Sequence, residues 1–270
     1  MPPFAANWAF FLDIDGTLLD IEGHPDDVRI ERPEAELVAG LHRATGGALA
    51  LVSGRPLAGI DALFHPLKLP IAGQHGAERR DARGKRHRHR FPVEALHRAA
   101  APVRKFVARN EGLIFEDKGA SVALHYRLAP RLQAAALAVV EEAAKTAGGA
   151  LEVQAGKMVY ELKPSGVDKG SAIGEFVSEA PFAGRVPVFL GDDVTDESGF
   201  RVVNRLGGHS VKIGEGETAA RWRLGDPAAA KSWLGAWMSA VACARAGELR
   251  PLRRPCFCSS SSCVMRLPLT

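Results

Sequence analysis

Two carboxylates separated by one residue stand near the start of the chain, in the segment Asp13-Ile-Asp15-Gly-Thr17. The apolar run before them, Trp8–Leu12, is typical of a buried strand, and open α/β sheets bind ligands beyond the carboxyl ends of their strands. Two carboxylates facing one phosphoryl group suit a nucleophile and an acid/base. The alternative is an Asp-Gly turn that only closes a strand, and the whole segment argues against it.

Phosphate-binding side chains follow a second apolar run. Ser53 and Arg55 come directly after Ala48–Val52, and a hydroxyl and a guanidinium are both good donors to phosphate. Lys169 stands at the predicted start of a helix and offers a cation, although a lysine there is usually only a surface residue. These residues extend the chemistry expected of the first segment.

Four acidic residues crowd together after the apolar run Val186–Leu190, namely Asp192, Asp193, Asp196 and Glu197. Carboxylates at this spacing repel one another unless a cation neutralises them. Mg²⁺ needs only one or two carboxylates together with a substrate phosphate. A solvated acidic turn is the alternative, and the buried strand directly before the cluster disfavours it.

These side chains require a sheet to position them. Four short apolar runs predict buried parallel strands, at 8–12, 48–52, 69–72 and 186–190. The segment Pro33–Thr45 has helical periodicity and ends at two glycines, so the first two strands form a parallel βαβ unit.

The middle third of the chain has another pattern, which predicts two copies of a helix followed by two strands. The helices are expected at 92–110 and 131–147, and the strands at 113–116, 121–128, 151–154 and 158–163. This αββαββ unit inserted in an α/β chain predicts a second domain that covers the sheet as a cap. The expected division is core 1–90, cap 91–162, core 163–242 and a disordered tail 243–270.

The composition is that of a globular protein, with 46% apolar and 24% charged residues. The net charge of +4 comes from two segments, because seven Lys/Arg stand against one Asp in 79–90 and five Arg against one Glu in 243–270. No run is long enough to span a bilayer, and the apolar start lacks the basic flank of a signal peptide. We expect a cytoplasmic protein.

The cysteines all lie in the predicted tail, so no disulfide framework is expected in the body of the chain. Cys256 and Cys258 with Cys263 lack a fourth ligand and a zinc-like spacing, which disfavours a metal site there. The segment Arg86–Arg90 alternates charge and predicts a solvated hairpin arm around Gly84.

The four chemical segments, in this order, resemble the four motifs of the haloacid dehalogenase superfamily of phosphatases. The resemblance implies a Rossmann-like parallel-sheet core with an inserted cap, and a phospho-aspartate mechanism that requires Mg²⁺. It assigns Asp13 as the nucleophile and Asp15 as the acid/base. The implied phosphate ligands are Ser53, Arg55 and Lys169. The implied metal residues are Asp13, Asp15, Asp192, Asp193 and Asp196.

The sequence further resembles the trehalose-6-phosphate phosphatases over about residues 7 to 240. The resemblance lies in Gly73-Gln-His75-Gly-Ala-Glu78, Gly156-Lys157-Met-Val-Tyr-Glu161, Gly166-Val-Asp168-Lys169-Gly and Gly191-Asp-Asp-Val-Thr-Asp-Glu197. It implies hydrolysis of trehalose 6-phosphate, the last step of trehalose biosynthesis. The residues implied to hold the sugar are His75, Glu116, Lys118, Arg127, Lys157 and Glu161. Lys157 and Glu161 fall on one face of their predicted strand.

Other functions stay open on the sequence. A phosphomutase on the same fold would return the phosphate to the sugar, and related phosphatases act on sucrose phosphate or mannosylglycerate phosphate. A nucleic-acid binder would use Arg79–Arg90 and the tail arginines. That segment lacks interleaved aromatic residues and any known binding module, so we expect neither a nucleic-acid nor a membrane partner.

Overall fold

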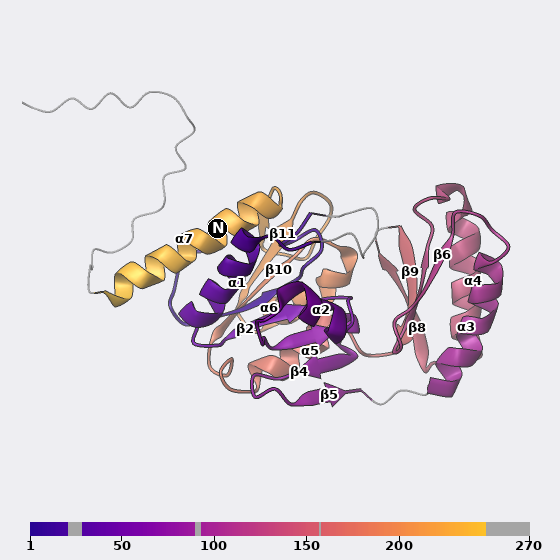
Figure 1. Cartoon of the computed structure of the whole chain (residues 1–270), viewed down its shortest axis with the longest axis horizontal. Helices are drawn as coiled ribbons and strands as arrows, with labels where there is room; N and C mark the ends of the chain where they lie inside the picture. Colours follow the sequence, from indigo (N-terminus) through magenta and orange to yellow (C-terminus); the bar gives the residue numbers. More distant parts are fainter. Residues whose placement is uncertain (21–28, 90–92, 157, 247–270) are drawn as a thin grey trace, which may run out of the picture.

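The structure is a computed structural model and describes residues 1–20, 29–89, 93–156 and 158–246. The strands of its larger sheet are β1 (Trp8–Leu12), β2 (Leu49–Val52), β3 (Ile71–Gly73), β4 (Glu78–Arg80), β5 (Arg86–Arg88), β10 (Val186–Gly191), β11 (His209–Ile213) and β12 (Trp222–Leu224). The helices beside this sheet are α1 (Arg32–Ala44), α2 (Leu57–Phe64), α5 (Lys169–Val177), α6 (Glu197–Arg205) and α7 (Pro227–Arg245) (Figure 1).

The larger sheet has the strand order β12-β11-β10-β1-β2-β3-β4-β5. Its strands are parallel from β12 to β3, and β4 and β5 are antiparallel. The chain first moves from β1 to β2 and later places β10 on the other side of β1, so the strand order reverses at β1. Such a reversal leaves a crevice beyond the strand ends. The four predicted strands are confirmed as the centre of this sheet.

The sheet is buried on both faces, which explains why its strands are continuous apolar runs rather than alternating ones. On β1, Trp8, Phe10 and Leu12 pack in one cluster with side chains of α1, α2 and α7. Ala9 and Phe11 pack in a second cluster with α5 and α6. Successive side chains of a strand point to opposite faces, so one strand anchors both helical layers.

The basic segment after β3 forms the predicted hairpin of β4 and β5, with Gly84 in the left-handed region at a φ of 84°. The two arginines of β5 are exposed, as predicted for this arm, whereas the two arginines of β4 are buried. Arg79 donates to Glu179 at 2.7 Å, and Arg80 donates to Asp61 at 2.7 Å. These pairs attach the edge of the sheet to α2 and to the turn after α5.

Between β5 and α5 the chain forms a second unit, which we call the cap unit. Its elements are α3 (Val93–Val107), β6 (Ile114–Asp117), β7 (Val122–His125), α4 (Gln133–Thr146), β8 (Leu151–Gly156) and β9 (Val159–Pro164). The strands form an antiparallel sheet of order β6-β7-β9-β8. Figure 1 shows this sheet between the larger sheet and the helices α3 and α4. The predicted αββαββ order is confirmed, whereas the domain boundaries stay predictions.

Among the described residues, no helix has the length and apolarity that crossing a membrane requires. Helix α7 ends at Arg245, so residues 243–245, placed in the tail from the sequence, are helical and Cys243 is exposed. Residues 247–270, with Cys256, Cys258 and Cys263, lie outside the described residues.

Candidate active site

Asp13 lies buried at the carboxyl end of β1, where its carboxylate meets the first residue of α5. The Lys169 amine donates to Asp13 Oδ1 at 2.8 Å and to Asp196 Oδ1 at 2.7 Å. Asp168 caps α5 by accepting the amide of Ser171, which fixes where the helix begins and hence where Lys169 stands. The buried ammonium of Lys169 therefore forms ion pairs with two buried carboxylates.

The balance of charge at this cluster is negative. Burial raises the pKa of Asp13 well above its usual value; Lys169 opposes the rise, and Asp196 and Asp192 add to it. Burial, followed by repulsion from Asp196, raises the pKa of Asp192 to about 6. Burial disfavours the charged amine of Lys169, but Asp13 and Asp196 outweigh it and raise its pKa. The carboxylates exceed the positive charge beside them, which favours a cation.

The loop after β10 brings Asp192 to the same place. Asp196 Oδ2 accepts the amides of Asp192 at 3.0 Å and Asp193 at 2.9 Å, so one buried carboxylate shapes the loop. A Cβ on Gly16 would lie 2.1 Å from Asp192 Oδ2, so the close approach requires glycine there. Asp13, Asp192 and Asp196 each offer an oxygen within 4.8 Å of the others, and this group can hold a metal ion.

The other predicted metal residues lie differently. Both oxygens of Asp15 accept from Arg55, Oδ2 from Nε and Oδ1 from Nη2, each at 2.7 Å. Asp193 accepts the amide of Val194 and begins the short 3-10 helix η4 (Val194–Asp196). Neither belongs to the group of three found among the described residues, and their metal role stays a prediction.

The phosphate residues lie at the end of β2, beside β1. Ser53 is buried, and its hydroxyl oxygen accepts the amide of Arg55 at 3.2 Å. The bidentate pair between Arg55 and Asp15 links the ends of the two strands. The predicted acid/base and two predicted phosphate ligands are therefore neighbours.

A second group of polar side chains connects the cap unit to the larger sheet. Glu161 on β9 is buried, and its Oε2 faces His75 Nε2 at 3.0 Å and accepts from the Lys118 amine at 3.1 Å. Its Oε1 accepts the Ser121 hydroxyl at 2.6 Å. Burial would raise the pKa of Glu161, but Lys118 and His75 hold it well below its usual value. The group therefore contains an ionised, buried carboxylate.

His75 stands between the two groups, in the 3-10 turn η2 (Gln74–Gly76) after β3. Its ring packs on Gly54, where a Cβ would lie 2.7 Å from the ring atoms. Burial lowers the pKa of His75, so the ring is neutral, although Glu161 acts in the other direction. Its buried Nδ1 has no hydrogen-bond partner among the described residues, which leaves one polar atom for a ligand to satisfy.

Of the other predicted sugar residues, Glu116 lies at the edge of the second group. Glu116 accepts from His125 at 2.8 Å and lies 4.0 Å from the Lys118 amine. Burial alone would lower the pKa of Lys118, but the carboxylates of Glu161 and Glu116 raise it. Asp15 raises it more weakly, so the charge of this cap-unit lysine is felt by a carboxylate of the larger sheet. Arg127 is exposed in the turn after β7, and Lys157 lies outside the described residues.

Sequence reasoning missed several residues of these groups. Thr17, whose hydroxyl donates to Asp13 Oδ2 at 3.5 Å, stood inside the first segment. Gln74 is next to His75 in the sequence, and Ser121 is the first residue of a predicted strand. Their positions next to predicted site residues or strands were the signal that could have identified them. Lys212 on β11, whose amine donates to the main-chain oxygen of Asp192, carried no signal, because nothing in the sequence relates these two positions.

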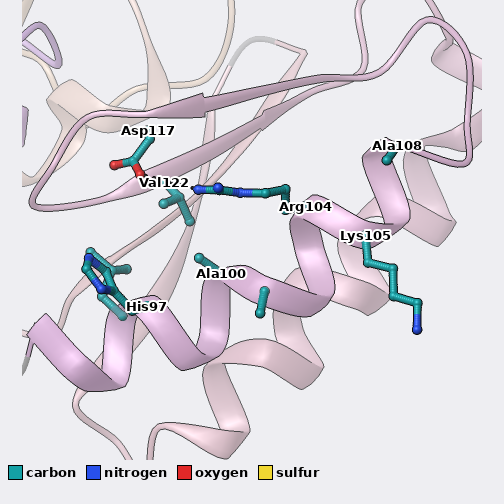
Figure 2. Close-up of a pocket in the computed structure, with 9 residues that line it drawn as sticks. His97, Ala100, Arg104, Lys105, Ala108, Asp117 and Val122 are labelled. Atoms are coloured by element: carbon teal, nitrogen blue, oxygen red, sulfur yellow. Dashed lines mark ion pairs between the residues drawn. The ribbon is translucent and has the colours of Figure 1, made fainter.

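A separate groove of about 570 Å³ lies within the cap unit, between α3 and the β6–β7 hairpin (Figure 2). Arg104 reaches from α3 to Asp117, with 3.5 Å between Nη2 and Oδ2, and its guanidinium covers the Phe115 ring at 4.7 Å. The lining residues are Leu96, His97, Ala100, Ala101, Arg104, Lys105, Ala108, Asp117 and Val122. Asp117 is the one carboxylate among these lining residues, so the groove does not offer a group of three carboxylates like that of the Asp13 cluster.

Known structures share this architecture. The C-terminal domain of C. albicans trehalose-6-phosphate phosphatase superposes with a TM-score of 0.78 at 21% identity, covering 87% of this chain and 92% of that one. A haloacid dehalogenase-like hydrolase from Bacteroides thetaiotaomicron gives 0.60 at 19% identity, covering 84% and 98%. The fold is therefore that of the haloacid dehalogenase-like phosphatases.

The sequence comparisons define the family within that fold. The family model described as trehalose-phosphatase matches residues 11–228. Trehalose-6-phosphate phosphatase of Escherichia coli is 46% identical over 86% of this chain and 87% of its own length. A probable trehalose-phosphate phosphatase of Sinorhizobium fredii is 48% identical, covering 77% and 78%. The chain belongs to the trehalose-phosphatase family and is a phosphoric monoester hydrolase.

Proposed function

We propose that this enzyme hydrolyses trehalose 6-phosphate to trehalose and phosphate through a phospho-aspartate on Asp13, as the last step of trehalose biosynthesis. One observation carries the proposal: two buried polar groups lie beside each other. One group contains Asp13 and Lys169 on the larger sheet and its helices. The other contains Glu161 and Lys118 of the cap unit, and His75 lies between the two groups. The names of the relatives at 46% and 48% identity support the substrate.

In the first half of the reaction, an oxygen of Asp13 attacks phosphorus and the bond from phosphorus to the sugar oxygen breaks. Asp15 gives the leaving oxygen a proton. Lys169 and the Ser53 hydroxyl donate to the phosphoryl oxygens, whose charge needs fixed donors. Without substrate, the Arg55 guanidinium donates to both oxygens of Asp15. A bound phosphoryl group would be a second acceptor for this guanidinium, and Asp15 could then transfer its proton to the leaving oxygen.

In the second half, the Asp15 carboxylate takes a proton from water, and the water oxygen attacks phosphorus. The bond between phosphorus and Asp13 breaks, so phosphate leaves and the Asp13 carboxylate is restored. Asp15 ends with the proton that it needs for the next cycle. No atom or charge beyond substrate and water is consumed.

The acidic cluster fits Mg²⁺. Asp13, Asp192 and Asp196 present oxygens within 4.8 Å, and burial, with repulsion among these carboxylates, raises the pKa of Asp13 and Asp192. The oxygens of Asp196 already accept three donors and those of Asp13 accept two, so Asp13 and Asp192 are the better ligands. Mg²⁺ prefers such a site of few carboxylates completed by phosphate. When bound, the ion supplies positive charge beside the transferring phosphoryl group.

We assign sugar recognition to the second group. The ionised Glu161 accepts hydrogen bonds from sugar hydroxyls, and the orphaned Nδ1 of His75 gains a partner. Lys118 and Glu116 lie within 4.0 Å of each other at the edge of this group. The assignments of Arg127 and Lys157, and the cytoplasmic location, stay predictions.

The test is phosphate release by the purified enzyme from trehalose 6-phosphate, sucrose phosphate, mannosylglycerate phosphate and p-nitrophenyl phosphate, each with Mg²⁺ and with EDTA. We expect Mg²⁺-dependent release and the highest kcat/KM on trehalose 6-phosphate. A higher value on another sugar phosphate would assign that substrate instead. A sugar phosphate that changes isomer without releasing phosphate, seen by phosphorus NMR, would indicate a phosphomutase.

A further inference from the structure

Lys212 is a buried lysine that the proposed chemistry does not use. It lies on β11, opposite Gly191 of β10 in the register of the sheet, and the residue is 6% exposed. Its amine donates to the main-chain carbonyl oxygen of Asp192, the residue after Gly191. A buried ammonium costs free energy unless it is paired, so this contact holds the amine where it is.

The main chain of Asp192 is held on both sides. Its N–H donates to Asp196 Oδ2 at 3.0 Å, and its C=O accepts from Lys212. The two bonds fix the peptide planes on either side of the Asp192 Cα. The direction of the Asp192 Cα–Cβ bond follows from that, so the carboxylate starts from a fixed point beside the Asp13 cluster.

Packing alone does not hold Asp192. A hollow of about 270 Å³ lies beside it, lined by Gly16, Asp20, Asp192, Ile213, Gly214, Glu215, Gly225, Asp226 and Pro227. Space of this size lets a loop residue move away from the Asp13 cluster. Hydrogen bonds to the main chain therefore keep Asp192 in position, as close packing keeps residues in position elsewhere in a protein core.

We propose that Lys212 is a positioning residue that fixes the Asp192 main chain and thereby aims the Asp192 carboxylate at the cation site. The inference rests on the proposed function, because it assumes that Asp192 binds Mg²⁺. Lys212 touches neither substrate nor cation in this role. It acts through the Asp192 carbonyl, and its positive charge also opposes the rise in the pKa of Asp192 that burial causes.

The experiment compares Mg²⁺ binding, measured by calorimetry without substrate, in the wild type, Lys212→Met and Lys212→Arg. Methionine keeps the length and apolar stem of lysine but has no donor. Loss of an outer hydrogen bond to a metal site costs about tenfold or more in affinity. We expect the Mg²⁺ Kd to rise about tenfold in Lys212→Met and to be partly restored in Lys212→Arg, whose guanidinium is again a charged donor.

Lys163→Met is the matched control. Lys163 is also a buried strand lysine whose amine donates to a main-chain oxygen, that of Val167, and it belongs to the cap unit. We expect both methionine variants to lower Tm and only Lys212→Met to weaken Mg²⁺ binding. An unchanged Mg²⁺ Kd in Lys212→Met, or an equal rise in both variants, overturns the inference.

The calorimetry also separates this inference from the proposed function. If the wild type binds Mg²⁺ but releases no phosphate from trehalose 6-phosphate, the substrate assignment fails and the positioning role of Lys212 is still measured. If the wild type hydrolyses trehalose 6-phosphate with Mg²⁺ and Lys212→Met shows the same Mg²⁺ Kd, the positioning role fails alone.

Discussion

The Asp13 carboxylate combines two properties at the residue scale. It is buried, which would make it a less solvated and more reactive nucleophile in the proposed reaction, and Lys169 holds one of its oxygens at 2.8 Å. Burial, together with Asp196 and Asp192, raises the pKa of Asp13 above its usual value although Lys169 opposes the rise. Added positive charge would favour the ionised form, so ionisation of Asp13 and binding of a cation should be coupled.

We expect Asp13→Asn to reduce turnover of trehalose 6-phosphate by about a thousandfold or more, because an amide is a poor nucleophile and a poor Mg²⁺ ligand. Phosphate release measures it. Asp81→Asn, in the turn between β4 and β5, is the control and should stay near wild type. Near-normal turnover by Asp13→Asn would contradict the phospho-aspartate mechanism.

Glu161 gives a test of recognition. A buried carboxylate that accepts from sugar hydroxyls contributes roughly tenfold to a hundredfold. We expect Glu161→Ala to lose that much kcat/KM on trehalose 6-phosphate and to keep its activity on p-nitrophenyl phosphate, which does not reach the cap unit. Glu152→Ala, which removes a β8 carboxylate paired with Lys163, should spare both substrates. An equal loss on both substrates in Glu161→Ala would mean a structural or phosphoryl-site role.

At the scale of elements, the turn after β3 links the end of β2 to the cap unit. The amide of His75 donates to the Ser53 carbonyl, and the amide of Gln74 donates to the Arg55 carbonyl. The Gln74 side chain accepts the amide of Ala120, in the β6–β7 hairpin, at 2.9 Å. Gln74 and His75 both have left-handed backbones, with φ of 49° and 55°, a strained form for residues other than glycine. The strain persists because bonds on both sides fix it.

We expect Gln74→Ala to lower kcat/KM on trehalose 6-phosphate by roughly fivefold, which corresponds to the loss of about one hydrogen bond. Activity on p-nitrophenyl phosphate should change little, since that substrate does not need the hairpin. The matched control is Gln133→Ala, because Gln133 donates to Tyr160 within the cap unit. Wild-type kcat/KM in Gln74→Ala, with Tm unchanged, would show that the contact with Ala120 does not matter for the substrate.

At the scale of the whole molecule, the cation site couples pH to stability. Folding raises the pKa of the Asp192 carboxyl from 3.8 to about 6, so its protonated form is favoured in the folded protein. The stability that this group contributes is present at low pH and is lost as pH rises through that window. A bound cation removes the loss, because it stabilises the ionised carboxylate.

Mg²⁺ should therefore raise Tm by several degrees at about pH 7.5 and by much less at about pH 5. Thermal unfolding with saturating MgCl₂, against KCl at equal ionic strength, measures the difference. Asp192→Asn removes one of the two titrating ligands and should reduce the pH dependence of the Mg²⁺ effect. An equal Mg²⁺ effect at both pH values in the wild type would place the cation elsewhere.

Much of the fold followed from local patterns. The four central strands are apolar runs because both faces of the sheet are covered, and the αββαββ order followed from helix and strand periods with glycine stops. Strands β11 and β12 and helices α2, α6 and α7 were missed. An edge strand such as β12 is half exposed, so its residues do not form the continuous apolar run that marks a central strand.

The sequence by itself determined the chemical residues, because Asp13, Ser53, Lys169 and Asp192 each stand directly at the end of a strand or the start of a helix. Which of them touch was decided by the tertiary structure. The Lys169 amine bridges Asp13 and Asp196, and Glu161 reaches His75 from the cap unit. Such contacts join positions far apart in the chain, and local periodicity carries no information about them. For the same reason only the fold identified Lys212, which the register of β10 and β11 brings to Asp192.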